Sequence, residues 1–432
     1  MLPPLSLERS INKIVREEWG RILASLVKHL GDIQLAEDCL QDAVISAMNH
    51  WGKNGLPNSP AAWLITVARR SAIDELRRRQ NFASKQAEIS YLLDLANRDA
   101  GETGSEIIPD KRLELIFTCC HPALSQKTQV ALTLRTLCGL STEEIASAFL
   151  DKPDAMQQRL TRAKKKISQA AIPYHIPEAD DLQGRLSSVL RVIYLIFNEG
   201  YSASVGESLI KTNLSDEAIR LARILRHLMP DETEVSGLLA LVLLHDSRRN
   251  ARISPTGQMI PLADQNRSRW NKSQICEGVT ILEMTLPQRR IGAYQLQAAI
   301  SAVHAQSPTW EETDWPEILA LYNLLYALQP TPVVRVNHAV ALSYAKSPND
   351  ALMVLEAAFA DGELGLYQPF YAAKADLLQR LDRRDEADEM YRIAIDLSEN
   401  DQERGFLQNQ KAVMNECGRQ GTTTQVVRSP LN

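Results

Sequence analysis

Apolar residues recur at intervals of three and four along almost the whole chain, whereas the strict alternation typical of a β-strand is rare. Side chains at these intervals share one face of an α-helix, so the pattern predicts an all-α protein. Residues 81–110 interrupt it, because they are polar and include Gly101 and Gly104. Pro173 and Pro177 interrupt it again.

These breaks predict the domain organisation of the chain. We expect four segments: a helical domain at 1–85, a linker at 86–110, a second helical domain at 111–171 and a helical C-terminal extension at 172–432.

The extension contains a weak internal repeat, clearest at 315–415. Apolar triplets recur 33 and then 36 residues apart, at Ile318/Tyr322/Leu325, Ala351/Leu355/Ala358 and Ala387/Tyr391/Ala394. This period is close to that of tetratricopeptide repeats, which are stacked helical hairpins with concave binding surfaces. We therefore predict a tetratricopeptide-like architecture there.

The segment "LAEDCLQDAVISAMNHW" is predicted to be a helix with an unusual outer face. Its predicted buried stripe is Ala36, Leu40, Val44, Ala47 and Trp51. The opposite face presents Asp38, Gln41, Asp42 and Ile45. Carboxylates around an exposed apolar residue favour a protein partner over DNA, although an ordinary solvated face is the alternative.

The next segment, "SPAAWLITVARRSAIDELRRR", is predicted to be a helix with a basic outer face. That face carries Thr66, Arg70, Asp74 and Arg77, with Arg78 and Arg79 at its end. Trp63, near its start, could stack on an unpaired base, but helix packing is the favoured interpretation. The face suits DNA phosphates.

Residues 141–167 have a helix-turn-helix pattern. Ser141 and Glu144 form a predicted capping box, and Pro153 suits the first turn of the next helix. The buried stripe of that helix is predicted to be Met156, Leu160, Ala163 and Ile167. Its opposite face presents Gln157, Gln158, Thr161, Arg162 and Lys165. Glutamine and arginine read base edges, and the run of Lys164 to Lys166 could neutralise phosphates, although a solvated basic face is the alternative.

The composition is that of a soluble globular protein, with 432 residues, 44% hydrophobic and 23% charged. No apolar run is long enough to span a membrane, no secretory signal is apparent, and six cysteines do not form a disulfide framework. We therefore expect a cytoplasmic protein. No phosphate loop or nucleophile motif occurs, so neither enzymatic activity nor a cofactor is expected.

The net charge of −5 is unevenly distributed. Residues 1–171 carry 23 Lys and Arg against 20 Asp and Glu, a net charge of +3, and the remainder carries 25 against 33, a net charge of −8. This asymmetry mildly favours a nucleic-acid partner for the N-terminal part.

Two other clusters could carry chemistry. Cys119 and Cys120 lack a second pair at metal-ligand spacing, so core packing is favoured over a metal site. The second cluster comprises His245, Asp246, Asp264, Arg267 and Trp270. An enzyme pocket is one interpretation of it, and buried ion pairs that join helices are the favoured one.

The segments "LAEDCLQDAVISAMNHW", "PAAWLITVARRSAIDELRRR" and "STEEIASAFLDKPDAMQQRLTRAKKKI", in this order, resemble the σ2 and σ4 domains of extracytoplasmic-function (ECF) sigma factors. The tail, with "IYLIFNEGYSAS" and the repeats, resembles the subgroup with a large C-terminal extension. The resemblance implies a factor that binds the RNA polymerase core, through the β′ clamp helices and the β flap, and directs initiation at a promoter.

The same resemblance implies three sets of site residues. The polymerase-binding set is Asp38, Gln41, Asp42 and Ile45. The set for the −10 element is Arg70, Asp74, Arg77 and Arg78. The set for the −35 element is Gln157, Gln158, Thr161, Arg162 and Lys165. Gln157 and Gln158 replace the usual small or basic residues, which leaves the −35 sequence preference open.

Two other functions fit parts of the same sequence pattern. One is a stand-alone helix-turn-helix regulator whose tetratricopeptide-like domain senses a ligand or a protein. The other is an enzyme in the C-terminal half. For the leading function we expect the extension to be regulatory, through contact with the sigma domains or with a separate regulatory protein.

Overall fold

The computed structural model describes residues 4–78, 110–149, 151–201, 212–254, 258–360, 364–398 and 400–421. These residues form helices joined by short turns, and they contain no β-strand beyond an isolated bridge between Ile253 and Met259. The predicted all-α class is confirmed. No helix in this part of the chain combines the length and the apolarity needed to cross a membrane.

The helices group into two compact units, residues 1–196 and 197–432. The predicted domains at 1–85 and 111–171 both belong to the first unit. The predicted linker lies outside the described residues except for Asp110, and the boundaries between the four segments stay predictions.

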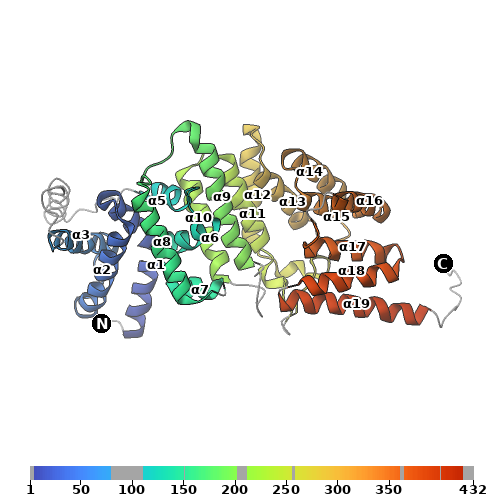
Figure 1. Ribbon diagram of the computed structural model, residues 1–432, viewed down its shortest axis with the longest axis horizontal. Helices are drawn as coiled ribbons and strands as arrows, with labels where there is room; N and C mark the ends of the chain where they lie inside the picture. Colours follow the sequence, from blue (N-terminus) through green and yellow to red (C-terminus); the bar gives the residue numbers. More distant parts are fainter. Residues whose placement is uncertain are drawn as a thin grey trace. The chain divides into compact units, whose positions relative to one another are not determined.

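Three helices open the first unit (Figure 1): α1 (Pro4–Leu30), α2 (Ile33–Asn54) and α3 (Pro60–Arg78). Asp32 caps α2 by accepting hydrogen bonds from the backbone N–H groups of Gln34 and Leu35. The apolar faces of these helices form one core, in which Trp51 is among the largest fully buried side chains.

Four further helices follow: α5 (Arg112–Cys119), α6 (Gln126–Cys138), α7 (Thr142–Ala148) and α8 (Pro153–Gln169). The predicted capping box is present, because Ser141 accepts from the Glu144 backbone N–H and the Glu144 carboxylate accepts from the Ser141 N–H. Gly139 ends α6 with φ of 69°, a left-handed conformation that favours glycine. A helix-turn-helix arrangement is therefore formed as the sequence predicts.

Helices α1 and α6 cross at very close range. A Cβ atom at Gly20 would lie 2.6 Å from the Leu137 carbonyl oxygen, and one at Gly139 would lie 2.9 Å from the Trp19 ring. Only glycines permit this approach, so the helices before and after the predicted linker pack against each other.

Helix α9 (Ala179–Tyr201) leads into the second unit. There α11 (Thr233–Asp246) is buried on nearly all sides and packs against α10 (Thr212–Leu228), α12 (Lys272–Thr285) and α13 (Ala293–Gln306). The connections include the short 3₁₀ helices η1 (Arg249–Ala251), η2 (Leu262–Asp264), η3 (Arg267–Arg269) and η4 (Leu286–Gln288).

Three consecutive helical hairpins complete the described part of the chain. They consist of α14 (Trp315–Leu328) and α15 (Pro332–Ala345), α16 (Pro348–Ala360) and α17 (Gln368–Arg380), and α18 (Arg384–Leu397) and α19 (Asp401–Gly421). Each predicted triplet lies on the first helix of a hairpin, and all its members are buried except Tyr322, which is half-buried. Figure 1 shows α17, α18 and α19 side by side, as stacked hairpins require.

Candidate functional site

The predicted outer face of α2 is an open surface. Asp38, Asp42 and Ile45 are exposed, Ile45 to 59%, whereas Gln41 is half-buried. Asp38 accepts a hydrogen bond from Gln34 Nε2 at 2.8 Å, and Asp42 accepts one from Ser71 Oγ of α3 at 3.1 Å. The carboxylates are thus held in place around an exposed apolar side chain, an arrangement that suits a protein partner.

Helix α3 lies beside α2 and presents Arg70 and Asp74 to solvent. Arg77 and Arg78 lie in its last turn, where the side chains are outside the described residues. Trp63 is half-buried, with its ring 5.3 Å from the Trp51 ring in an edge-on contact. This packing supports the favoured interpretation of Trp63 as a packing residue.

Helix α8 has the two faces that the sequence predicts. Met156, Leu160, Ala163 and Ile167 are all buried. The predicted −35 residues, namely Gln157, Gln158, Thr161, Arg162 and Lys165, are all exposed. Gln157 accepts a hydrogen bond from Thr142 Oγ1 at 2.9 Å, which holds its amide toward α7.

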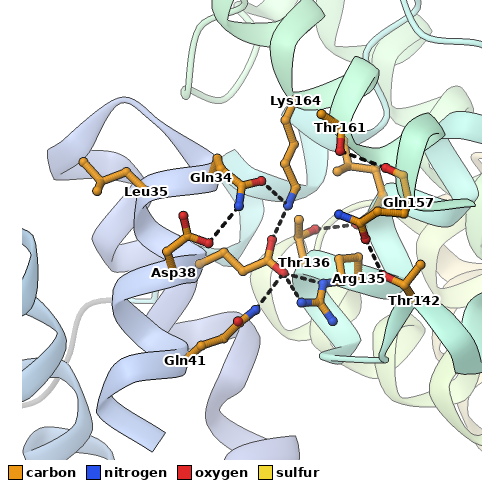
Figure 2. A network of polar contacts seen from close by, with 12 residues as sticks. Gln34, Leu35, Asp38, Gln41, Arg135, Thr136, Thr142, Gln157, Thr161 and Lys164 are labelled. Carbon is orange, nitrogen blue, oxygen red and sulfur yellow. Dashed lines mark hydrogen bonds and ion pairs between the residues drawn. The ribbon is translucent and has the colours of Figure 1, made fainter. Parts of the chain in front are cut away.

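Glu37 of α2 is the centre of a charged network that the sequence pattern did not reveal. Figure 2 labels its partners Gln41, Arg135 and Lys164. The Glu37 side chain is 1% exposed and accepts hydrogen bonds from Arg135 of α6 and, at 2.5 Å, from Lys164 of α8. Lys164 also donates to Gln34 Oε1 at 2.9 Å. In this conformation Lys164 is therefore an ion-pair partner within the protein, and its predicted contact with a phosphate would require this ion pair to break.

A polar cleft of about 260 Å³ lies at this network, between α2 and the pair α7 and α8. Asp38 and Gln41 line one side, and Thr142, Gln157 and Lys164 line the other. Figure 2 shows these side chains pointing toward one another. The structure thus brings the edges of two predicted surfaces, for polymerase and for −35 DNA, to one cleft.

Sequence reasoning missed Glu37 because it concentrated on the outer face of α2. One signal was present: Glu37 falls four residues after Ile33 and three before Leu40, and both are buried. A glutamate at that spacing lies on the inward face and needs a cationic partner.

Cys119 and Cys120 are core residues, as favoured. Both are buried, and their thiols contact Thr136 Oγ1 and Thr133 Oγ1. Burial raises the pKa of Cys119 to about 12 and that of Cys120 further, so both thiols stay protonated near neutral pH. Within the described residues no cluster of His, Cys, Asp and Glu could hold a metal ion.

We expect these thiols to be inert toward a water-soluble disulfide reagent. The thiolate is the reactive form, and burial removes both the thiolate and access to it. The exposed Cys276 should react first, and Cys119 and Cys120 only after denaturant is added. Mass spectrometry of labelled peptides measures this order. Modification of Cys119 in the native protein would contradict it.

Comparison with known proteins identifies three regions of similarity. Residues 14–82 match sigma-70 region 2, residues 114–167 match sigma-70 region 4, and residues 185–286 match a family of unknown function (DUF6596).

Two curated proteins are similar to this chain. An uncharacterized protein of Rhizobium meliloti is 41% identical over 392 residues, which cover 90% of this chain and 92% of the relative. The RNA polymerase sigma-H factor of Pseudomonas aeruginosa is 26% identical over 172 residues, which cover 38% of this chain and 88% of the relative. No solved structure matches.

Proposed function

Since this chain belongs to the sigma-70 family, with the regions of an ECF-type factor followed by a large C-terminal extension, we propose that it binds the RNA polymerase core and directs initiation at a particular promoter. One observation carries the proposal. The chain has both sigma regions, and each presents an exposed face suited to its partner, acidic and apolar on α2 and basic on α8. The protein would act in the cytoplasm, without catalytic activity.

The polymerase would dock on the face of α2 formed by Asp38, Gln41, Asp42 and Ile45. Ile45 supplies apolar area at the centre, while the carboxylates steer the approach of a basic surface. In the family this segment binds the β′ clamp helices, and region 4 binds the β flap.

Promoter DNA would contact α3 and α8. Arg70 and Asp74, followed by Arg77 and Arg78, are assigned to the −10 element. The exposed residues of α8 are assigned to the −35 element, where Gln157 and Gln158 suit adenine edges and Arg162 suits guanine. A small net positive charge would suffice because the polymerase core would supply much of the contact with DNA.

The closed arrangement of the first unit is proposed to be the free form of the protein. Lys164 and Gln157 face α2 across the cleft, so a duplex cannot lie against that side of α8. Binding to two separate promoter elements therefore requires the helices before and after the linker to part, and the Glu37 network would be the contact that breaks.

The extension is proposed to regulate this step. The matched part of the Pseudomonas relative makes up 88% of that protein, which leaves no room for a counterpart of the extension. That relative is matched by the sigma regions without the extension, which supports a separate role for the extension here. Its net charge of −8 would also oppose binding of the free protein to DNA.

Transcription with purified components tests the proposal. The protein is added to RNA polymerase core with promoters selected from transcripts that rise on overexpression. Specific transcripts that require both the core and this protein support it. Dimeric binding to a palindromic site without the core would instead support a stand-alone regulator, and failure to bind the core would reject the proposal.

We expect Arg162→Ala to weaken promoter binding by the assembled holoenzyme about 5- to 150-fold, because one base or phosphate contact is worth roughly 1–3 kcal/mol. Binding to the core alone should not change. Fluorescence anisotropy of labelled promoter DNA measures the effect, and Lys127→Ala, an exposed cation on α6, serves as the control. Equal losses in both variants would indicate a nonspecific charge effect.

A further inference from the structure

Two arginines of the second unit contact Tyr201 at the end of α9, and a third, Arg267, lies close enough to Arg248 for their charges to interact. Arg252 is 9% exposed, and its guanidinium lies 3.6 Å from the centre of the Tyr201 ring. Arg248 donates a hydrogen bond to the Tyr201 hydroxyl at 2.9 Å. Arg267 arrives from η3 and stacks on Trp270 at 4.8 Å. Together they form a partly buried arginine cluster.

No carboxylate of the described residues forms an ion pair with the arginine cluster, Arg248, Arg252 and Arg267. Through their charges, Glu403 and Asp246 raise the pKa of Arg252, and Glu311 raises that of Arg267, against the larger lowering effect of burial and without an ion pair to either arginine. Arg249, in contrast, binds both Asp216 and Asp246 at 2.7 Å. The buried ion pairs expected for this segment therefore exist at Arg249 and are missing from its neighbours.

Two histidines lie within the field of these arginines. Burial, and then the charges of Arg248 and Arg267, lower the pKa of His304 to about 4. Burial, and then Arg248 and Arg252, lower the pKa of His245 well below its usual value. Both imidazoles are therefore neutral near pH 7, and the positive potential comes from the arginines.

Polar nitrogens at the same place lack partners. Arg267 Nη1 donates to the His304 and Ser307 carbonyl oxygens at 2.5 and 2.6 Å, but Arg267 Nη2 is buried without an acceptor. His304 Nδ1 and Trp270 Nε1 are also buried and unpartnered. A buried donor without a partner costs about 1–3 kcal/mol, and a buried unpaired cation costs more, so native proteins rarely retain several together.

We propose that the arginine cluster binds a small anion through a phosphate or carboxylate group. The planar guanidinium forks would hold the oxyanion, and Arg267 Nη2 would donate one of the hydrogen bonds. The burial of Arg252 and of Arg267 Nη2 favours a small molecule over a polyanionic surface. This inference stands on the extension alone and does not depend on the proposed function.

Isothermal titration of the full-length protein with sodium phosphate and with sodium citrate, at matched ionic strength, tests the proposal and separates the two anion classes. We expect saturable binding of at least one anion at millimolar concentration. Arg248→Gln should weaken it at least tenfold. The matched control is Arg223→Gln, which removes an exposed arginine paired with Glu277 in the same unit and should change affinity less than twofold.

Thermal unfolding without added anion gives a second readout. Arg248→Gln removes one of several repelling charges but keeps a donor for Tyr201, so we expect the melting temperature to rise by about 2–4 °C. Arg267→Lys keeps the positive charge but removes the planar guanidinium, so it should also weaken anion binding. It replaces Arg248→Gln as the test variant if Arg248→Gln fails to fold. Absence of saturable binding of both anions, or equal losses of affinity in Arg248→Gln and Arg223→Gln, would overturn the proposal.

Discussion

Ile45→Asp is expected to abolish transcription that depends on this protein while leaving its fold intact. The side chain is 59% exposed at the centre of the acidic face of α2, so aspartate replaces it without disturbing a core. In a complex, however, the same position would be a buried apolar contact, and such a central residue is typically worth about 2 kcal/mol or more. Burying the charged aspartate in the complex would weaken binding further, because the carboxylate loses its contact with water. Binding to polymerase core should therefore weaken by at least about 30-fold.

The matched control for this prediction is Ser46→Asp. Ser46 is the next residue of α2 and is also exposed, but it points about 100° away from Ile45 around the helix axis. Ser46→Asp introduces the same charge on the same helix, and the affinity for polymerase core should change less than threefold, about 0.6 kcal/mol. Surface plasmon resonance with immobilised core measures both variants, and circular dichroism confirms folding. Normal core binding by Ile45→Asp would remove the α2 face from the proposed function.

Local features were predicted well from the sequence because each depends on a few neighbouring residues. The capping box at Ser141 and Glu144 and the buried stripe of α8 follow from spacing alone, and both are confirmed. The exposure of Ile45 also follows from helix geometry. The roles of these faces stay predictions, because exposure shows that a partner can reach a side chain but does not identify the partner.

Contacts between distant residues could not be predicted in this way. The pattern of α8 places Lys164 beside exposed Lys165, and nothing nearby indicates a partner 127 residues earlier at Glu37. Likewise, the sequence around Gly20 does not indicate that the Leu137 backbone packs directly against it. The arginine cluster presents the same difficulty, because the sequence suggested ion pairs and, among the described arginines between 248 and 269, the ion pairs are at Arg249.

Glu37→Gln is expected to open the first unit. Removing the carboxylate charge leaves the half-buried Arg135 and Lys164 beside each other without an anion, and breaking a fully buried ion pair costs about 3–5 kcal/mol, which is the upper limit here. The protein can avoid the cost of two unpaired cations without unfolding. Separation of α2 from α6 and α8 returns both cations to water while each helical group keeps its own core, so the cost should appear as opening.

Fluorescent labels at Ser46→Cys and Ser168→Cys, both exposed, measure this opening by energy transfer in a chain whose Cys276 and Cys417 are replaced by serine. We expect transfer to fall in Glu37→Gln and core binding to tighten, because a larger fraction of the protein is then competent to bind. Lys164→Met should open the unit less, since Glu37 keeps Arg135. Lys165→Met, the neighbouring exposed lysine, should not open it at all.

If Glu37→Gln lowers the melting temperature while energy transfer stays unchanged, the network is simply part of the core. The helices on both sides of the linker would then engage the polymerase as one body, and binding to two promoter elements would need another explanation.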